Sequence, residues 1–299
     1  MGQATGLYHA GSRTLQDRLG VRDLADHVGR SVGEGIRSVA AAFLELQPQL
    51  VLGAADPASG EVWASTVTGT PGFVRATGPR RISVAGGPPP TDPLATALAT
   101  PGTPVGTIAL DPRTRRRMRL DGRLSAAPRG FAVEADRVFA NCPKYLQRRE
   151  TYETVSGRLP GPPRRGTGLT PEQAGFVAAA DTFFLASVRE GGADASHRGG
   201  NPGFVRVPAP GELAWRDYPG NAMFLSLGNL EADPRAGLLF LDWATGRTLQ
   251  LTGEARTEFG PGGERTVRFT VARSVDTPAA LPLRWSAPEY SPANPDRDR

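Results

Sequence analysis

The sequence predicts a mainly β protein with short helices, built from two tandem copies of one small barrel. Three observations support this prediction. A 14-residue segment recurs 131 positions further along the chain, the second copy alternates short strand-like segments with turn residues, and 299 residues suffice for two domains of ordinary size. Hydrophobic residues make up 39% and charged residues 22%, which is typical of a globular chain.

The internal repeat has two blocks in one register. Residues 63–76 and 194–207 are identical at eight of their 14 positions. A second block repeats at the same offset of 131. Its residues are Gly106, Asp111, Thr114, Arg116, Leu120 and Gly122, which recur as Gly237, Asp242, Thr245, Arg247, Leu251 and Gly253. A period this long indicates two duplicated domains rather than a solenoid of short repeats.

The predicted domains are residues 1–150 and 151–299. The first holds extra helices between residues 14 and 46 and then the first barrel. The second holds the other barrel and a tail after Trp285 that we expect to be loosely held, because it is rich in Pro, Asp and Arg. Residues 148–167, with prolines and glycines at 160–163, form the predicted linker.

The elements of the second copy follow in order. Thr170 begins a capping box with proline at the first helical position, so a short helix runs toward residue 180. Residues 182–189 are rich in strand formers, and the strand at 204–207 follows a Pro202-Gly203 turn. Residues 213–215 form a further short strand.

The remaining segments complete the barrel. Asn221 is the predicted cap of a helix that runs to about residue 231 and stops before Asp233-Pro234. Residues 237–242 and 247–255 form a hairpin, and the alternating segment 266–272 is the last strand. Six short strands with one or two helices describe a small barrel.

Composition excludes several classes of function. The net charge of +5 comes almost wholly from arginine, and the one dense basic run at residues 113–119 has no aromatic partner or recognition helix, so we expect no nucleic-acid binding. No apolar run is long enough for a membrane span, and no export signal is visible. A single cysteine, Cys142, fits a reducing cytoplasm, and three scattered histidines predict no metal site.

Several segments of the chain resemble the pyridoxamine 5′-phosphate oxidase-like, FMN-binding split-barrel family. They are residues 194–205, 219–221, 227–229 and 234–240, together with 8–11, 141–145 and 283–285. The closer match is to long bacterial members with two tandem units. The resemblance implies two tandem split β-barrels of the FMN-binding type, with FMN in a groove between two units, here the two halves of one chain.

The resemblance also implies which residues bind the cofactor. FMN needs an arginine fork and a helix N-terminus for its phosphate, and a flat apolar wall for its ring. Ser196 and Arg198 share one face of a strand, whereas His197 points to the other, where a turn-stabilising role is at least as plausible as a catalytic one. The predicted cofactor-binding residues are Ser196, His197, Arg198, Gly199, Pro202, Gly203, Phe204, Asn221, Ser226 and Asn229; no catalytic residue is assigned.

The first copy keeps the frame of this site without its polar groups. Ser65 and Pro71-Gly72-Phe73 remain, but Thr66 and Val67 stand where the second copy has His197 and Arg198. The sequence therefore predicts one flavin site per chain, in the second copy. Two residues depart from the family: Ala222 and Met223 stand where many small members have a basic residue, so phosphate binding rests on Arg198, Ser196 and backbone amides.

The expected function is that of an FMN-dependent oxidoreductase acting on a small organic molecule. Lys144 is the only lysine, so oxidation of a vitamin B6 phosphate is not expected. The alternative is a protein of the same fold that binds or senses a flavin, a deazaflavin or haem without turnover; a further alternative is a structural protein whose site has decayed. We expect the two halves to pack as an intrachain pseudo-dimer, with a homodimer also open.

Overall fold

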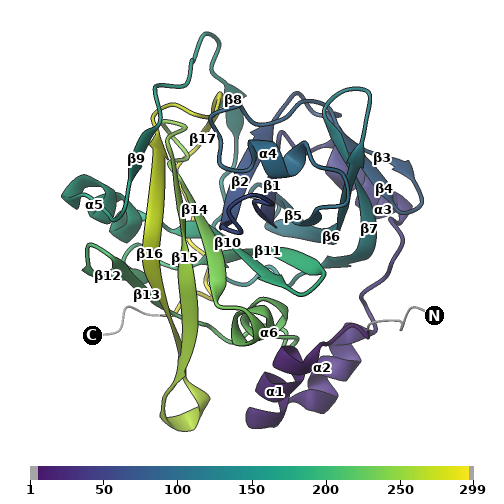
Figure 1. Cartoon of the computed structure of the whole chain (residues 1–299), viewed down its shortest axis with the longest axis vertical. Coiled ribbons are helices and arrows are strands. Elements are labelled where there is room, and N and C mark those ends of the chain that lie inside the picture. The colour runs from purple at the N-terminus through teal and green to yellow at the C-terminus, as the bar shows by residue number, and fades with distance from the viewer. Residues whose placement is uncertain (1–5, 296–299) are drawn as a thin grey trace.

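The computed structural model describes residues 6–295 and contains two large antiparallel sheets side by side (Figure 1). The first sheet has the strand order β2-β1-β5-β6-β7-β4-β3. Its strands are β1 (Gln49–Ala55), β2 (Val62–Thr68), β3 (Val74–Gly78), β4 (Arg81–Val84), β5 (Pro104–Asp111), β6 (Arg116–Ala126) and β7 (Phe131–Ala140).

The second sheet has the order β11-β10-β14-β15-β16-β13-β12, and the short strand β9 (Arg164–Gly166) pairs with β16. Its strands are β10 (Thr182–Arg189), β11 (Gly192–Gly199), β12 (Val205–Ala209), β13 (Glu212–Arg216), β14 (Arg235–Leu241), β15 (Thr248–Phe259) and β16 (Arg265–Thr277). Strand for strand, this order repeats that of the first sheet. The predicted fold class, mainly β with two tandem split barrels, is confirmed.

The two sheets also share an irregularity. The pairing of β6 with β7 shifts register between Asp121 and Gly122, and that of β15 with β16 shifts between Thr252 and Gly253. An added Cβ would lie 1.9 Å from the carbonyl oxygen of Glu134 at Gly122, and 1.9 Å from that of Thr270 at Gly253. Glycine recurs at this point of the repeat because the bulge brings the neighbouring backbone too close for a side chain.

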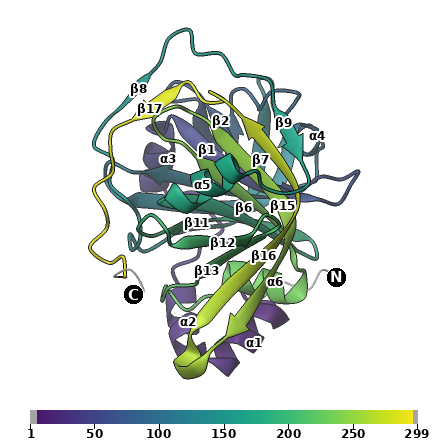
Figure 2. The same ribbon diagram turned by 90° about the vertical axis from the view of Figure 1, so that its left-hand side faces the viewer.

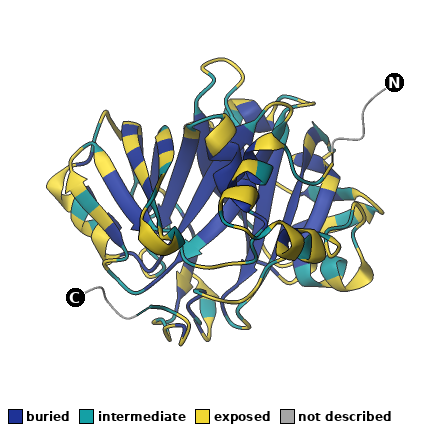
Figure 3. Ribbon diagram, turned by 90° about the horizontal axis from the view of Figure 1, so that it is seen from below, coloured by how far each residue is buried: buried dark blue, intermediate teal, exposed yellow. Residues whose placement is uncertain are grey.

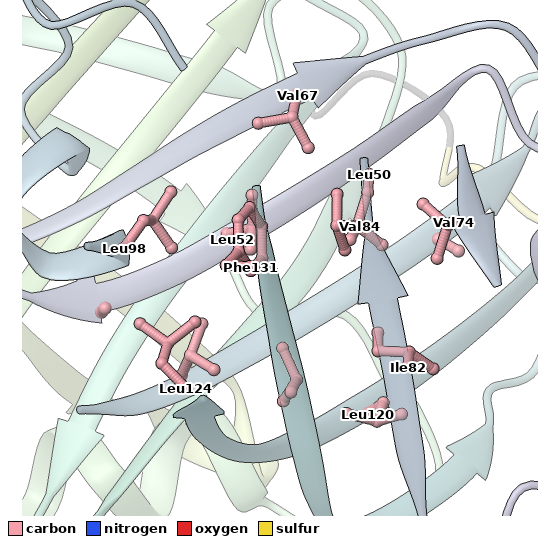
Figure 4. Packing of buried hydrophobic residues seen from close by; sticks show 14 of the residues in the cluster. Leu50, Leu52, Val67, Val74, Ile82, Val84, Leu98, Leu120, Leu124 and Phe131 are labelled. Atoms are coloured by element: carbon pink, nitrogen blue, oxygen red, sulfur yellow. The ribbon is translucent and has the colours of Figure 1, made fainter. Parts of the chain in front are cut away.

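Each sheet closes around its own apolar core. Figure 4 shows part of the first, with Leu50, Leu52 and Phe131 among its members. The core of the second half contains a ring cluster in which Phe183 stacks with Phe240 and meets Trp215 edge-on. Alternating inward residues of both β-rich halves supply these cores, as the strand periodicity predicts. Figure 3 shows the resulting pattern, with buried strand interiors and exposure on the outer loops and helices.

A third apolar cluster joins the two halves. It combines Val51, Ile108 and Leu110 from the first sheet with Phe184 and Leu239 from the second. The backbones approach closely here: an added Cβ at Gly106 would lie 2.3 Å from the amide nitrogen of Ala195, and one at Gly237 would lie 2.6 Å from the Cα of Trp63. Gly106 of the first half faces the second, and its repeat equivalent Gly237 faces the first. Both glycines therefore lie where the halves meet.

The helices are short and lie outside the sheets. They are α1 (Ala10–Arg18), α2 (Arg22–Gly29), α3 (Ser38–Glu45), α4 (Ala95–Leu98), α5 (Pro171–Ala179) and α6 (Leu225–Ala232), with a 3-10 turn at Pro261–Gly263. The capping box of Thr170 at α5 is present as predicted. No helix within residues 6–295 is both long and apolar enough to cross a membrane.

The predicted linker is more ordered than its prolines suggest. It contains β8 (Tyr152–Thr154), which pairs with β17 (Leu283–Trp285), and β9. The expectation of a loose tail after Trp285 is wrong for residues 286–295, because Gln147 accepts a hydrogen bond from the Ser291 amide and Asn294 donates one to Asn201. Residues 296–299 of that tail lie outside the described residues. Side-chain amides of residues distant in sequence form hydrogen bonds with the tail, and amino-acid composition does not predict such contacts.

The N-terminal helices pack below the second half. Figures 1 and 2 show α1 and α2 beside α6, at the end of the molecule where β15 and β16 project. Gly11 of α1 and Gly228 of α6 allow close contact, since an added Cβ at Gly11 would lie 2.2 Å from the carbonyl oxygen of Gly228. Helix α1 therefore packs on the second half, while Val28 of α2 packs in a cluster that also contains Phe139 of the first half.

Candidate functional site

A cavity of about 890 Å³, including space open to solvent, lies where the two halves meet. The first half contributes β6 and the segment after β7. The second half contributes the ends of β11 and β13, the loop after β13 and the start of α6. Its polar and aromatic lining residues are Arg117, Arg119, Asn141, Lys144, Tyr145, His197, Arg198, Phe204, Trp215, Arg216, Asp217, Tyr218, Asn221, Phe224 and Ser226.

Arg117 reaches the cavity from β6 and has no carboxylate partner among the described residues. Its guanidinium donates to Nδ1 of His197 at 2.7 Å and to the carbonyl oxygen of Cys142 at 2.7 Å, and its Nε has no partner there. Burial, together with the nearby charge of Arg198, lowers the pKa of Arg117 to about 10. Arg117 is thus protonated at neutral pH and lacks a counter-charge.

Arg119 lies two residues further along β6 on the same face. It forms an ion pair with Asp194, whose side chain is fully buried, and Ser226 donates a hydrogen bond to the other oxygen of Asp194 at 2.5 Å. Burial lowers the pKa of Arg119 to about 9. The pair connects β6 of the first half to β11 and α6 of the second.

Arg198 approaches the cavity from β11. Its Nε lies 3.8 Å from Asp217, which also accepts from Arg265 at 2.9 Å, and its guanidinium donates to the carbonyl oxygen of His197. Burial lowers the pKa of Arg198, and Asp217 partly opposes this shift. One carboxylate shared by two arginines leaves a net positive charge. Together with Arg117, this gives the cavity lining a net positive charge.

His197 is held as a neutral hydrogen-bond donor. Because Arg117 can only donate, Nδ1 of His197 accepts and the ring proton resides on Nε2. Nε2 is buried and has no hydrogen-bond partner within the described residues. Burial, Arg117 and Arg198 all hold the pKa of His197 well below its ordinary value. A buried donor without a partner in a cavity wall favours a ligand that accepts a hydrogen bond.

The pKa of His197 predicts how stability depends on pH. The folded protein keeps His197 neutral, whereas the unfolded chain takes up a proton near pH ~6.5, so stability is full above that pH and falls below it. One pH unit below ~6.5, His197 should lower the free energy of unfolding by about 1.4 kcal/mol relative to its value at high pH. Urea unfolding of the parent protein and of His197→Asn, at pH values above and below ~6.5, measures this loss of stability.

His9 is a second histidine that contributes to the pH dependence of stability. Burial also lowers its pKa, so part of the pH dependence remains in the His197→Asn variant. Asparagine keeps an acceptor for Arg117 without a titrating group. An unchanged pH slope in His197→Asn would contradict the assignment of a depressed pKa to His197.

The loop before α6 differs from the sequence prediction. The helix begins at Leu225, not at Asn221, and Phe224, the residue before it, has a left-handed backbone with φ 51°. Asn221 instead accepts from the amide of Met223 at 3.2 Å, as in an Asx turn. The prediction that Asn221 caps the helix is therefore wrong, because the side chain stabilises a turn three residues earlier.

The N-terminal helix α1 fixes this loop. Gln16, fully buried, donates to the carbonyl oxygen of Met223 at 3.1 Å, and Ser12 donates to that of Phe224 at 3.3 Å. Ala222 also has a left-handed backbone, with φ 60°. Non-glycine residues adopt this conformation only where surroundings enforce it. Contacts from the far end of the sequence thus shape the cavity wall.

The structure brings together six of the ten predicted site residues. His197, Arg198, Gly199, Phe204, Asn221 and Ser226 line the cavity. His197 and Arg198 point to opposite faces of β11, yet both reach the cavity because β11 is an edge strand.

The other four lie elsewhere. Ser196 is buried and donates to the carbonyl oxygen of Leu185, and Asn229 donates to Ser187 and contacts His9. Pro202 and Gly203 form the turn before β12 and do not line the cavity. Arg198 lines the cavity and Ser196 does not, although the two share one face of β11, because strand alternation does not determine how far along the strand a cavity extends.

Sequence reasoning missed the residues that the first half contributes. Arg117 and Arg119 belong to the dense arginine run at residues 113–119, for which the sequence predicts no role in the site. The repeat held the signal: at the offset of 131, Thr248 and Gln250 occupy their positions. Comparing the two copies position by position, as for Arg198 and Val67, also distinguishes Arg117 from Thr248 and Arg119 from Gln250. Asn141 and Tyr145 lie in one of the segments that resemble the family.

The comparisons with known proteins agree with the fold. Residues 169–286 match the family model described as pyridoxamine 5′-phosphate oxidase. This stretch spans the second sheet and the second half's share of the cavity. The match covers less than half of the chain and supports, for this stretch, the resemblance to the pyridoxamine 5′-phosphate oxidase-like split-barrel family that the motifs indicate. No curated protein matches the chain.

Similar solved structures include a candidate pyridoxamine 5′-phosphate oxidase from Lactobacillus delbrueckii. It is 12% identical, with a TM-score of 0.31, and the match covers 36% of this chain and 94% of that one. HupZ from Group A Streptococcus is also 12% identical, with a TM-score of 0.29, and the match covers 34% of this chain and 89% of that one.

Proposed function

We propose that the protein is an FMN-dependent oxidoreductase that acts on a small organic molecule, with one FMN held between its two halves. The observation that supports this most is the convergence of buried arginines from both halves on one cavity. Arg117 and Arg119 come from β6, and Arg198 comes from β11. This division fits the proposed units, residues 1–150 and 151–299, as partners in a pseudo-dimer.

The residues present fit the chemical groups of FMN. Arg117 and Arg198 offer forked donors and positive charge for the phosphate, and the start of α6 adds backbone amides. Phe204, Trp215 and the Tyr145–Tyr218 pair, whose rings lie 5.1 Å apart, offer apolar surface for the ring. Bound FMN would supply hydride or electron exchange with the substrate, while the protein binds and orients both.

A second candidate function is binding without turnover. Asp217, the one carboxylate among the described lining residues, is engaged by arginine, and the buried Asp194 behind the wall pairs with Arg119, so neither is a free general base. This arrangement also suits a protein that holds a flavin, a deazaflavin or haem and does not react further. The absorption spectrum of the purified protein identifies the bound group. Aerobic re-oxidation of the reduced protein by a small substrate distinguishes the enzyme from the binding protein.

Arg198→Ala tests the contact with the phosphate. A charge-assisted hydrogen bond to phosphate contributes about 1.5–3 kcal/mol, so FMN should bind roughly 10- to 150-fold more weakly. Titration of the apoprotein, followed by flavin fluorescence, measures this and should saturate near one FMN per chain. Riboflavin lacks the phosphate and should be little affected. An equal loss for both ligands would mean that Arg198 shapes the ring pocket instead.

Arg117→Thr tests whether the first half takes part in binding. This change places at Arg117 the residue that the second half has at the equivalent position, Thr248. We expect FMN affinity to fall at least about tenfold, because an uncompensated cation is lost from the cavity. Thr248→Ser is the matched control and should leave FMN affinity unchanged. Equal affinities in Arg117→Thr and the parent protein would restrict the site to the second half.

A further inference from the structure

A second cavity, of about 830 Å³ including open space, lies at the pseudo-equivalent position between the halves. The first cavity is built from β11, β6, the loop after β13 and the segment after β7. The second is built from their counterparts: β2, β15, the loop after β4 and the segment after β16. The linker residues Pro160–Pro163 also line it, and they have no counterpart in the first cavity.

The charges of the two cavities are opposite. Thr248 and Gln250 stand in place of Arg117 and Arg119, and Thr66 and Val67 in place of His197 and Arg198. No arginine, lysine or histidine lines the second cavity within residues 6–295, and its one ionisable lining group is Asp92. A cavity that lacks the cations of the first and is lined by a carboxylate does not suit a phosphate.

Asp92 is held in place by neutral donors alone. Ser65 donates to it at 2.6 Å, the Leu94 amide at 2.8 Å and Gln250 at 3.2 Å. Arg165 lies close enough to affect its charge, but its guanidinium donates to the carbonyl oxygen of Thr91, and Asp92 forms no ion pair with any described residue. Burial raises the pKa of Asp92, so the carboxylate would gain from a cationic partner.

We propose that this second cavity binds a small primary amine with an apolar body, its ammonium group paired with Asp92. The rest of the wall supports this choice. Leu239, Leu281 and the prolines of the linker offer apolar surface, and Gln250, which donates to both Asp92 and the carbonyl oxygen of Ala64, keeps the carboxylate oriented. An ammonium supplies the cation that the lining lacks, and a hydrocarbon body fits the apolar remainder.

Calorimetric titration with benzylammonium chloride tests the proposal on the full chain. We expect one saturable site per chain with a millimolar or tighter Kd. Benzyl alcohol has nearly the same shape without the charge and should bind at least about tenfold more weakly. Potassium chloride at equal ionic strength controls for non-specific salt effects. Saturating FMN should not displace the amine, because FMN is assigned to the other cavity.

Two variants make the test specific. Asp92→Asn keeps the acceptor for the Leu94 amide and should weaken benzylammonium roughly 10- to 150-fold. Ala280→Phe keeps Asp92 but fills part of the cavity, and it should abolish binding even if Asp92→Asn fails to fold. Both folded variants should keep the FMN affinity of the parent. Absent binding, unchanged amine affinity in either folded variant, equal affinity for benzyl alcohol, or competition by FMN would overturn the proposal.

Discussion

Gly106→Val is expected to lower the free energy of unfolding by about 3 kcal/mol or more. An added Cβ would lie 2.3 Å from the amide nitrogen of Ala195 and 2.4 Å from Asp194 backbone atoms. These are backbone atoms of the opposite half, so no side-chain rotation relieves the overlap and the two sheets must separate. Urea unfolding followed by circular dichroism measures the loss. The same change at Gly237, whose added Cβ would meet the Trp63 backbone, should have a similar effect.

Gly175→Ala is the control for this experiment. Gly175 lies within helix α5, and an added Cβ there meets nothing within 4 Å. Alanine should therefore stabilise the protein by about 0.5–1 kcal/mol, because it restricts the unfolded chain and favours helix. A Gly106→Val protein as stable as the parent would show that the halves do not pack as closely as the structure has them.

Arg119→Gln is expected to destabilise the protein by about 3–5 kcal/mol, since it leaves the buried carboxylate of Asp194 without its charged partner. Ser226 alone would remain to donate to Asp194. Glutamine is the residue at the equivalent position of the repeat, Gln250, so the backbone there accepts it. Chemical denaturation measures the change.

A double-mutant cycle with Asp194→Asn separates the ion pair from packing. Each single change leaves one buried charge uncompensated, while the double variant leaves none. The double variant should thus lose less stability than the sum of the singles, with a coupling of at least about 1 kcal/mol. Additive losses would mean that Arg119 and Asp194 stabilise the fold independently. In that case the pair would not join the two halves.

Local patterns predicted much of the fold. The strand at residues 182–189, the capping box at Thr170 and the hairpin of β14 and β15 lie where the sequence places them. These features depend on the alternation of neighbouring side chains and on donors a few residues away, so the sequence contains the information directly. The helix start at Asn221 was misplaced because α1, some two hundred residues earlier in the chain, holds the loop through Gln16 and Ser12.

The sequence by itself determined the internal repeat at an offset of 131, the fold class and the absence of His197 and Arg198 equivalents in the first copy. Only the tertiary structure decided that Arg117 and Arg119 of the first half complete the cavity of the second, and that Ser196 and Asn229 lie outside it. The reason is physical. The repeat and the side-chain periodicity describe single segments of the chain, whereas this cavity lies between the two halves, whose backbones approach closely at Gly106.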